Sequence, residues 1–225
     1  MKVAVLFSGG KDSTYSLWIA LQQFEEVKLI SVLSAEESFL YHYQKEHIIK
    51  GLEEAIGVPI TIVTVQSEEK ELDQLEKAVK NLRVDAIVIG GLLSEYQRIK
   101  FNEVARRCEI PCFAPLWRKD HTLLLQDIEK HFEVIFSTIA SMGFSEQDLG
   151  RKLDQEMLNR LQKLHERDGL SIGGEGGEYE TLVLDAPFYK KKLVIDEMKK
   201  EWNEAKLFGY CRIMKVHTEE KNYKN

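Results

Sequence analysis

The sequence of 225 residues has only three cysteines and four prolines, and none of its apolar runs approaches a membrane span of roughly 18 residues. Cys108, Cys112 and Cys211 form neither an even disulfide framework nor a Cys-x-x-Cys pair, which disfavours disulfide scaffolds and zinc knuckles. The apolar start, Met1–Phe7, is too short for a signal peptide. We therefore expect a cytoplasmic protein with reduced thiols and no membrane partner.

An excess of basic charge is also missing. Lysine and arginine number 31 against 37 acidic residues, a formal net charge of −6. Proteins that coat nucleic acid usually show a basic excess, and the basic residues Arg106, Arg107 and Lys190–Lys192 are too scattered for an RNA groove. We expect no nucleic-acid partner, and the composition is compatible with a homo-oligomer.

Short apolar runs alternate with helical patterns through the first half of the chain. The runs are continuously apolar, as in strands that are buried on both faces, and they cover Lys2–Phe7, Val27–Leu33, Ile60–Val65 and Ala86–Gly90. Between them, apolar residues recur at helical spacing. The pattern predicts an α/β fold, a Rossmann-like parallel sheet wrapped by helices, with ligands at the carboxyl ends of the strands.

The alternation stops at a turn-like stretch that contains Pro111 and Pro115. We therefore expect a nucleotide-binding domain over residues 1–118 and a smaller C-terminal α+β substrate domain over residues 119–225. Its expected elements are helices at about 122–132 and 154–167, strands at 134–137, 181–184, 193–195 and 210–216, a Ser145-x-x-Asp148 capping box, and a frayed tail after His217.

The first strand leads directly into a loop that suits phosphate. Gly9 and Gly10 permit close approach of an anion, and the following helix offers its N–H groups and dipole. Lys11 adds positive charge and Asp12 is a hard oxygen ligand suited to Mg²⁺. Ser8 and Ser13 add hydroxyl donors. From two glycines alone, a simple chain turn is an equally good interpretation.

The loop is not a Walker A motif. That motif needs glycine at position 5 and serine or threonine directly after the lysine, where this chain has Val5 and Asp12. Instead, Ser8-Gly9-Gly10-Lys11-Asp12-Ser13 resembles the signature of the N-type ATP pyrophosphatases. The resemblance implies that the loop holds the β and γ phosphates of ATP while a substrate attacks the α phosphorus.

Other strand ends supply further candidate residues. The superfamily resemblance implies adenine contacts near Leu33 and Ser34, against the alternative of ordinary residues at a strand exit. Gly90 and Gly91 follow the fourth strand. Ser94 and Gln97 fit a capping box, which places Arg98 in the first turn of the next helix. A cation is disfavoured there by the helix dipole, so a phosphate or carboxylate partner would explain Arg98, against the alternative of a solvated arginine.

Two more segments carry polar groups in an unusual setting. His42, between two tyrosines, can serve as acid, base or substrate contact, although a single histidine more often packs or is solvated. The glycine-rich run Gly173–Gly177 implies a tight bend or a close ligand, and it places Glu175, Glu178 and Tyr179 together. Such groups can orient an amine or bind a quaternary ammonium; a glycine-rich hairpin with solvated glutamates is the alternative.

Several segments together are similar to one branch of this superfamily, the diphthine–ammonia ligases. The segments are Ser8–Ser13, Phe39–His42, Ser94–Arg98, Ala114–Trp117 and Gly174–Thr181, the last followed by Asp185-Ala186-Pro187. The resemblance implies ATP-dependent amidation of diphthine on elongation factor 2 with ammonia, through an acyl-adenylate, with release of AMP and pyrophosphate.

The residue chemistry and the resemblance together give roles to the candidate residues. The expected catalytic residues are Lys11, Asp12, Arg98 and Glu178, with Asp12 as the metal ligand. ATP contacts are expected at Ser8, Gly9, Gly10, Lys11, Asp12, Ser13, Leu33, Ser34, Gly90 and Gly91, and substrate contacts at His42, Tyr96, Glu175, Glu178 and Tyr179. The implied ligands are ATP, Mg²⁺ and ammonium, with elongation factor 2 as protein substrate.

Two other functions stay open at this point. A tRNA-modifying ATP pyrophosphatase is disfavoured by the acidic balance and the missing Cys-x-x-Cys pairs. A module that binds ATP or AMP without chemistry would gain nothing from Asp12 or from the glycine-rich second segment.

Overall fold

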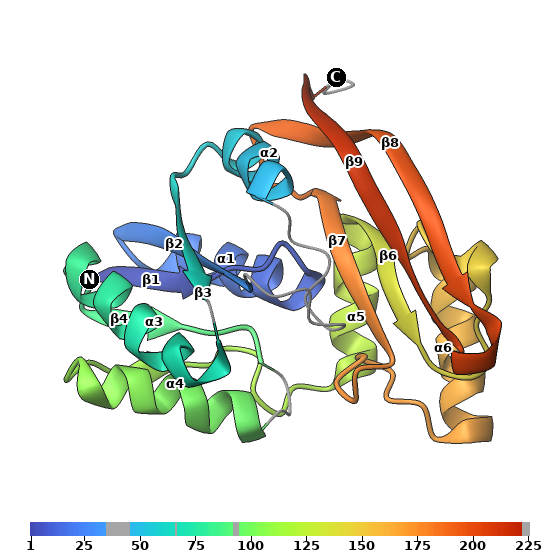
Figure 1. Cartoon of the computed structure of the whole chain (residues 1–225), viewed down its shortest axis with the longest axis horizontal. Helices are drawn as coiled ribbons and strands as arrows, with labels where there is room; N and C mark the ends of the chain where they lie inside the picture. Colours follow the sequence, from blue (N-terminus) through green and yellow to red (C-terminus); the bar gives the residue numbers. More distant parts are fainter. Residues whose placement is uncertain (35–45, 66, 92–94, 222–225) are drawn as a thin grey trace. The chain divides into compact units, whose positions relative to one another are not determined.

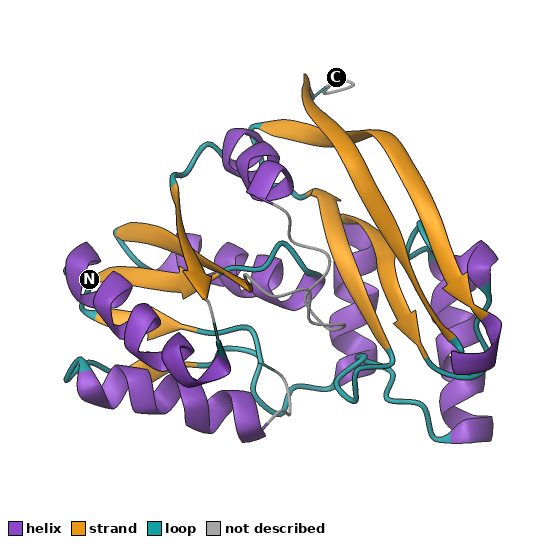
Figure 2. Cartoon of the chain, in the orientation of Figure 1, coloured by secondary structure: helices purple, strands orange, loops and turns teal. Residues whose placement is uncertain are grey.

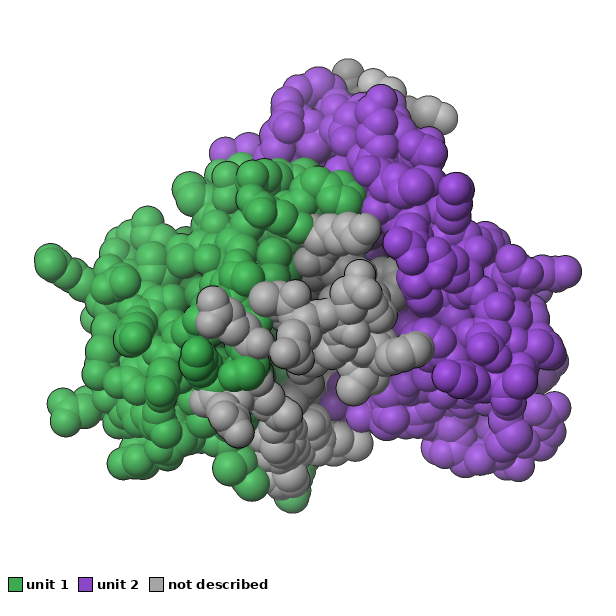
Figure 3. All heavy atoms as spheres, in the orientation of Figure 1, with its two compact units in different colours: residues 1–53, 57–118 green, residues 54–56, 119–225 purple. Residues whose placement is uncertain are grey.

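The computed structural model describes residues 1–34, 46–65, 67–91 and 95–221. The chain divides into two compact units, coloured separately in Figure 3. Unit 1 comprises residues 1–53 and 57–118, and unit 2 comprises residues 54–56 and 119–225. In the described part of the chain, no helix has both the length and the apolar character needed to cross a bilayer.

Unit 1 is built on a parallel sheet of five strands in the order β3-β2-β1-β4-β5 (Figures 1 and 2). Strands and helices alternate along the chain, as the sequence pattern predicts. They are β1 (Lys2–Leu6), α1 (Lys11–Gln23), β2 (Glu26–Ser34), α2 (Glu46–Ile56), β3 (Ile60–Val65), α3 (Glu68–Leu82), β4 (Ala86–Val88), α4 (Glu95–Arg107) and β5 (Cys112–Phe113).

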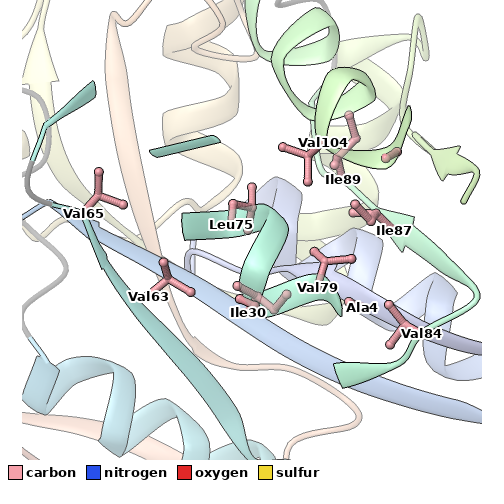
Figure 4. Packing of buried hydrophobic residues seen from close by; sticks show 12 residues of the cluster. Ala4, Ile30, Val63, Val65, Leu75, Val79, Val84, Ile87, Ile89 and Val104 are labelled. Carbon is pink, nitrogen blue, oxygen red and sulfur yellow. The ribbon is translucent and has the colours of Figure 1, made fainter. Parts of the chain in front are cut away.

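Helices cover this sheet closely. On one face, Leu75 and Val79 of α3 and Val104 of α4 join Ala4 and Ile30 of the strands in one buried cluster (Figure 4). Successive side chains of a strand point to opposite faces, and the neighbours of Ala4 in β1 are also fully buried. Both faces of the central strand are therefore covered, which explains its unbroken apolar run.

The strand order places a topological switch point between β1 and β4. From β1 the chain builds β2 and β3 on one side, and it then crosses to β4 and β5 on the other. Loops that follow β1 and β4 therefore lead away in opposite directions, and open parallel sheets bind their ligands at this point. The Rossmann-like α/β prediction is confirmed.

The fifth strand, β5, is absent from the sequence-based prediction, which expected only a turn over these residues. Its two residues pair with Ile87 and Val88 of β4. Pro111 lacks an N–H, yet its carbonyl accepts a hydrogen bond from the Ile87 N–H at 3.0 Å, so the proline serves this edge as an acceptor.

Unit 2 contains an antiparallel sheet of four strands in the order β7-β6-β9-β8. This smaller α+β arrangement agrees with the predicted class. Its elements are α5 (His121–His131), β6 (Glu133–Ala140), the 3₁₀ turn Glu146–Asp148, α6 (Gln155–Asp168), β7 (Tyr179–Asp185), β8 (Lys191–Asn203), the 3₁₀ turn Glu204–Lys206 and β9 (Phe208–Glu220). The predicted capping box of Ser145 and Asp148 is present.

The expectation of a frayed tail after His217 is wrong. Strand β9 continues to Glu220, and Thr218 pairs with Leu193 of β8 while its hydroxyl donates to Glu54 at 2.6 Å. Lys221 then donates to the Ala186 carbonyl at 2.6 Å. Strands β8 and β9 also have 13 residues each, far more than predicted. Cross-strand pairing stabilises their charged ends, and the composition of one strand alone does not reveal it.

Candidate functional site

The loop after β1 begins from a fixed point. The Phe7 N–H donates to the Ile30 carbonyl at 2.8 Å, and the Phe7 carbonyl accepts from the buried Ser31 hydroxyl at 2.6 Å. Both partners belong to β2, the strand beside β1. The chain is therefore held in the sheet as far as Phe7, and the turn starts at Ser8.

Two serines close this turn across the glycine pair. The hydroxyl oxygens of Ser8 and Ser13 lie 3.0 Å apart, and the Ser13 hydroxyl also accepts from the Ser8 N–H at 3.2 Å. Ser13 in turn donates to the Gly10 carbonyl at 3.0 Å. Gly9 has a φ of 78°, a left-handed conformation that favours glycine. The serines thus shape the loop, in addition to any contact with phosphate.

The N-terminus of α1 faces the end of this turn. Gly10 is the N-cap, and no side chain caps the helix. The first hydrogen bond that enters the helix runs from the Thr14 N–H to the Gly10 carbonyl at 3.0 Å. The N–H groups of the first helical turn have no intrahelical acceptor, so together with the helix dipole they suit an anion.

Lys11 and Asp12 place opposite charges in the first turn of α1. Lys11 is only 4% exposed, and its ammonium bonds to Asp12 Oδ2 at 2.7 Å. The second oxygen, Asp12 Oδ1, is buried and has no hydrogen-bond partner. A buried acceptor of this kind is costly unless a further cation or donor engages it, so the residues fit a nucleotide-bound Mg²⁺.

The protein side chains near Asp12 would not by themselves supply all the ligands of a Mg²⁺ ion. Among the described residues, no three acidic, histidine or cysteine side chains gather closely enough to hold a metal ion. Mg²⁺ in nucleotide sites is usually bound by one or two carboxylates, phosphate oxygens and water. The single carboxylate of Asp12 therefore fits a metal that arrives with a phosphate ligand.

The end of β4 lies directly against the same loop. A Cβ atom on Gly90 would meet the Ser13 nitrogen at 2.8 Å and the Ser13 Cα at 2.9 Å. No side chain larger than hydrogen fits there unless the loop moves. Gly90 and the half-buried Gly91 therefore border the loop at the switch point.

Arg98 belongs to the first turn of α4, which follows β4. Its guanidinium carbon lies 5.0 Å from the centre of the Trp117 ring, in a cation–π contact. Trp117 follows β5, the strand next to β4. The structure thus pairs Arg98 with an aromatic residue to which the sequence assigned no role.

The remaining candidates of unit 1 are less completely described. Leu33 and Ser34 end β2, beside β1 at the carboxyl edge of the sheet, and Leu33 is half-buried. Tyr96 lies in α4, but its side chain is outside the described part of the structure, as is the whole of His42. The nucleotide and substrate contacts assigned to these residues stay predictions.

In unit 2, Glu178 folds back onto the glycine-rich segment. Its carboxylate accepts hydrogen bonds from the Ser171 N–H at 3.0 Å and from the Gly176 N–H at 2.8 Å. The two bonds hold the segment in a closed turn, which is the tight bend expected from the glycines. A carboxylate has about four acceptor sites, so Glu178 retains capacity for a further donor.

Tyr179 is the buried anchor of the same segment. It is 3% exposed, packs on Phe136 with ring centroids 4.9 Å apart, and donates its hydroxyl to the Ile172 carbonyl at 2.5 Å. Its neighbour Glu175 is half-buried and donates its N–H to the Ser171 hydroxyl at 3.3 Å. The substrate contacts predicted for these residues stay predictions.

Glu180 points to the opposite side of β7 from Tyr179. Its carboxylate accepts from the Thr138 hydroxyl at 3.3 Å. Solvent reaches part of the side chain, but the surrounding protein desolvates the carboxylate and raises the pKa of Glu180.

Models of one protein family match both halves of the chain. The diphthamide synthase N-terminal domain matches residues 1–111, and the diphthamide synthase C-terminal domain matches residues 120–218. The chain belongs to the diphthamide synthase family. The two matches follow each other along the sequence with only a short gap.

Named relatives agree with this membership. The chain is 32% identical to a diphthine–ammonia ligase of Danio rerio and 31% identical to that of Bos taurus, over 98% of this chain and 98% and 94% of those relatives. A diphthine–ammonia ligase of Schizosaccharomyces pombe is 31% identical over 88% of this chain but only 36% of its own length. The family thus includes proteins that are much longer than the shared region.

Solved structures give weaker matches. A predicted subunit of tRNA methyltransferase from Methanocaldococcus jannaschii aligns with 83% of this chain and 98% of its own, at 18% identity and a TM-score of 0.45. The assignment to the family rests on the sequence matches, and the fold class rests on the strand order.

Proposed function

We propose that the chain is a ligase that makes an amide from the carboxylate of diphthine and ammonia, the last step of diphthamide biosynthesis. The main support for this proposal is that family models of the diphthamide synthase N-terminal and C-terminal domains match the two halves of the chain, one after the other. The loop Ser8–Ser13 at the switch point is consistent with the use of ATP in this step. The substrate we propose is elongation factor 2 that bears diphthine.

The reaction needs an activated acyl group, because a carboxylate is a poor acyl donor to ammonia. We propose that the diphthine carboxylate attacks the α phosphorus of ATP, which forms an acyl-adenylate and releases pyrophosphate. Nitrogen then attacks the acyl carbon, the bond from that carbon to the phosphate oxygen breaks, and AMP leaves. The nitrogen loses a proton in this step, and the product is the amide.

The residues of unit 1 have defined tasks in this proposal. The N–H groups at the start of α1 and the Lys11 ammonium bind the β and γ phosphates, and they stabilise the charge that develops on pyrophosphate. Asp12 would hold Mg²⁺, which neutralises phosphate charge when bound. Leu33 and Ser34 border the base, and Gly90 and Gly91 let the phosphates approach the backbone.

In unit 2, the segment Gly174–Thr181 recognises diphthine and ammonium in this proposal. Glu175 and Glu178 supply negative charge for the trimethylammonium group of diphthine or for ammonium. The Glu178 carboxylate is already held by two backbone N–H groups, so it is oriented before the substrate arrives. Tyr179 fixes the position of the segment through its buried ring.

We also propose that the enzyme works in the cytoplasm. All three cysteines are free thiols, and burial raises the pKa values of Cys112 and Cys211 to about 11. Thiols of this kind are usual for a reducing compartment and show no sign of the activated cysteine that a glutaminase would need.

One assay tests the proposed function directly. The protein is mixed with MgATP, ammonium and elongation factor 2 bearing diphthine, and nucleotides and the modified histidine are followed by mass spectrometry. We expect one AMP and one pyrophosphate for each diphthine converted to diphthamide. Formation of ADP would exclude the mechanism, and AMP release without amidation would exclude the substrate.

A further inference from the structure

The contact between Arg98 and Trp117 joins two segments that follow neighbouring strands. Arg98 lies in the first turn of α4, which follows β4, and Trp117 lies in the turn after β5. Parallel neighbours end at the same edge of a sheet, so both residues belong to the carboxyl edge that also carries Ser8–Ser13. β4 is one of the two strands that flank the switch point, and Gly90 at its end touches the loop at Ser13.

The Trp117 ring is set by its own turn. The Trp117 N–H donates to the Ala114 carbonyl at 3.1 Å, and the preceding Leu116 is 1% exposed and anchors the turn in the core. Arg118 has a φ of 57°, a left-handed conformation that reverses the chain directly after the ring. A buried anchor on one side and a reversal on the other fix the backbone from which the indole extends.

Arg98, in contrast, has a long side chain with several rotatable bonds, and the contact with the indole restricts it. Its position in the first turn of α4 is electrostatically unfavourable for a cation, and the indole face offsets this cost. A cation–π contact is not a hydrogen bond, so the contact with the indole itself takes up no N–H donor of the guanidinium, and such donors match phosphate oxygens in pairs.

We propose that Trp117 is a positioning residue that holds the Arg98 guanidinium at the switch point, ready to bind the α phosphate during adenylate formation. This inference rests on the proposed function and adds a residue to it. Trp117 acts through Arg98 and does not itself touch the reacting atoms.

A matched control is present on the same ring. The Arg118 guanidinium carbon lies 6.0 Å from the Trp117 ring centre, against 5.0 Å for Arg98, and the Arg118 side chain is exposed. Arg118→Gln and Arg98→Gln each remove one positive charge that lies near the Trp117 ring. Only the Arg98 substitution should affect adenylate formation.

The test is a double-mutant cycle on diphthine-dependent AMP release. Trp117→Leu should lower kcat about three- to thirtyfold, the range expected for loss of a cation–π contact, with little change in the KM for ATP. In an Arg98→Gln background, Trp117→Leu should have no further effect on kcat, while Trp117→Phe in the native background should keep most of the activity. Arg118→Gln should match the wild type.

Several outcomes would overturn the proposal. Additive losses from Arg98→Gln and Trp117→Leu, or equal losses from Trp117→Phe and Trp117→Leu, would mean that the ring does not act through Arg98. If Trp117→Leu does not fold, the cycle is run with Trp117→Phe and Arg98→Lys, which weaken the same contact. No AMP from the wild type would defeat the proposed function, whereas an active wild type with an additive cycle would defeat this inference alone.

Discussion

The Lys11 ammonium and the Asp12 carboxylate form an ion pair at 2.7 Å, although the two residues are neighbours in the chain. The pair occupies one carboxylate oxygen and leaves the other, Asp12 Oδ1, buried without a partner. In the proposed reaction, Lys11 binds phosphate oxygens and Asp12 binds the metal.

Asp12→Ala should lower turnover more than it weakens ATP binding. Loss of the carboxylate removes the metal ligand but releases the Lys11 ammonium for phosphate, so we expect kcat to fall on the order of 100-fold and the Kd for ATP to rise much less. Single-turnover AMP release and calorimetric ATP titration measure the two effects. Asp12→Asn, which keeps the shape but not the charge, is the control. Unchanged turnover in either variant would remove Asp12 from the metal role.

Gly90→Ala should disturb the loop from the side of β4. The new methyl would lie 2.8 Å from the Ser13 nitrogen, so the loop must shift, at a cost of about 1–3 kcal/mol in unfolding free energy. We expect loss of ATP binding together with this destabilisation. Gly169→Ala is the control, because a methyl there is strained only by the φ of 73° and meets no atom within 4 Å. A control variant that loses ATP binding equally would show that the effect is general.

Glu178→Ala should impair amidation more than nucleotide binding. The substitution also leaves the Ser171 and Gly176 N–H groups without their acceptor, which costs about 1–3 kcal/mol if they stay shielded from water. Amide hydrogen exchange at these two residues should therefore accelerate. Glu178→Gln keeps one strong acceptor and should protect the loop better, while it still lowers amidation. An equal loss of ATP affinity and amidation would move Glu178 out of the substrate role.

His217 should contribute more to the free energy of unfolding in mild acid than in base. Its ring lies 2.7 Å from Asp196 and 3.1 Å from Glu219, and the hydrogen bond to Glu219 first, with Asp196, raises the pKa of His217 above 6.5. The protonated ring favours the folded state, so its contribution is fully present below about pH 6.5 and is lost as pH rises through the folded pKa. Thermal unfolding of His217→Gln should show the larger deficit near pH 5.5 and none near pH 9. A constant deficit would contradict this.

The parallel sheet was predictable because its central strands are buried on both faces. Residues such as Val3, Ala4 and Val5 then form a continuous apolar run, which the chain shows directly. β5 escaped prediction because two residues after a proline carry no periodicity, and only their pairing with β4 defines the strand. In β8 and β9, charged residues such as Lys199 and Lys200 obscured strands that cross-strand pairing extends.

The candidate site also has one part that the sequence indicates and one that it does not. The turn Ser8–Ser13 and the helix start after it could be predicted because their signal is contiguous in sequence, and the phosphate contacts of the loop stay a prediction. The contact of Arg98 with Trp117 could not, because it joins residues 19 positions apart through the packing of β5 on β4. An aromatic residue just after a proline turn was the available signal, and it gains meaning only once β5 is recognised.

The brevity of β5 also affects how the protein behaves at high concentration. A sheet edge of two residues, Cys112 and Phe113, exposes few unpaired backbone groups to another chain, and the Phe113 ring rests on Phe24 with centroids 5.7 Å apart. Long open edges invite strand-by-strand self-association, and very short edge strands reduce it. This side of the sheet therefore offers little backbone for the addition of another strand, and we expect that lengthening β5 by redesign would lower solubility.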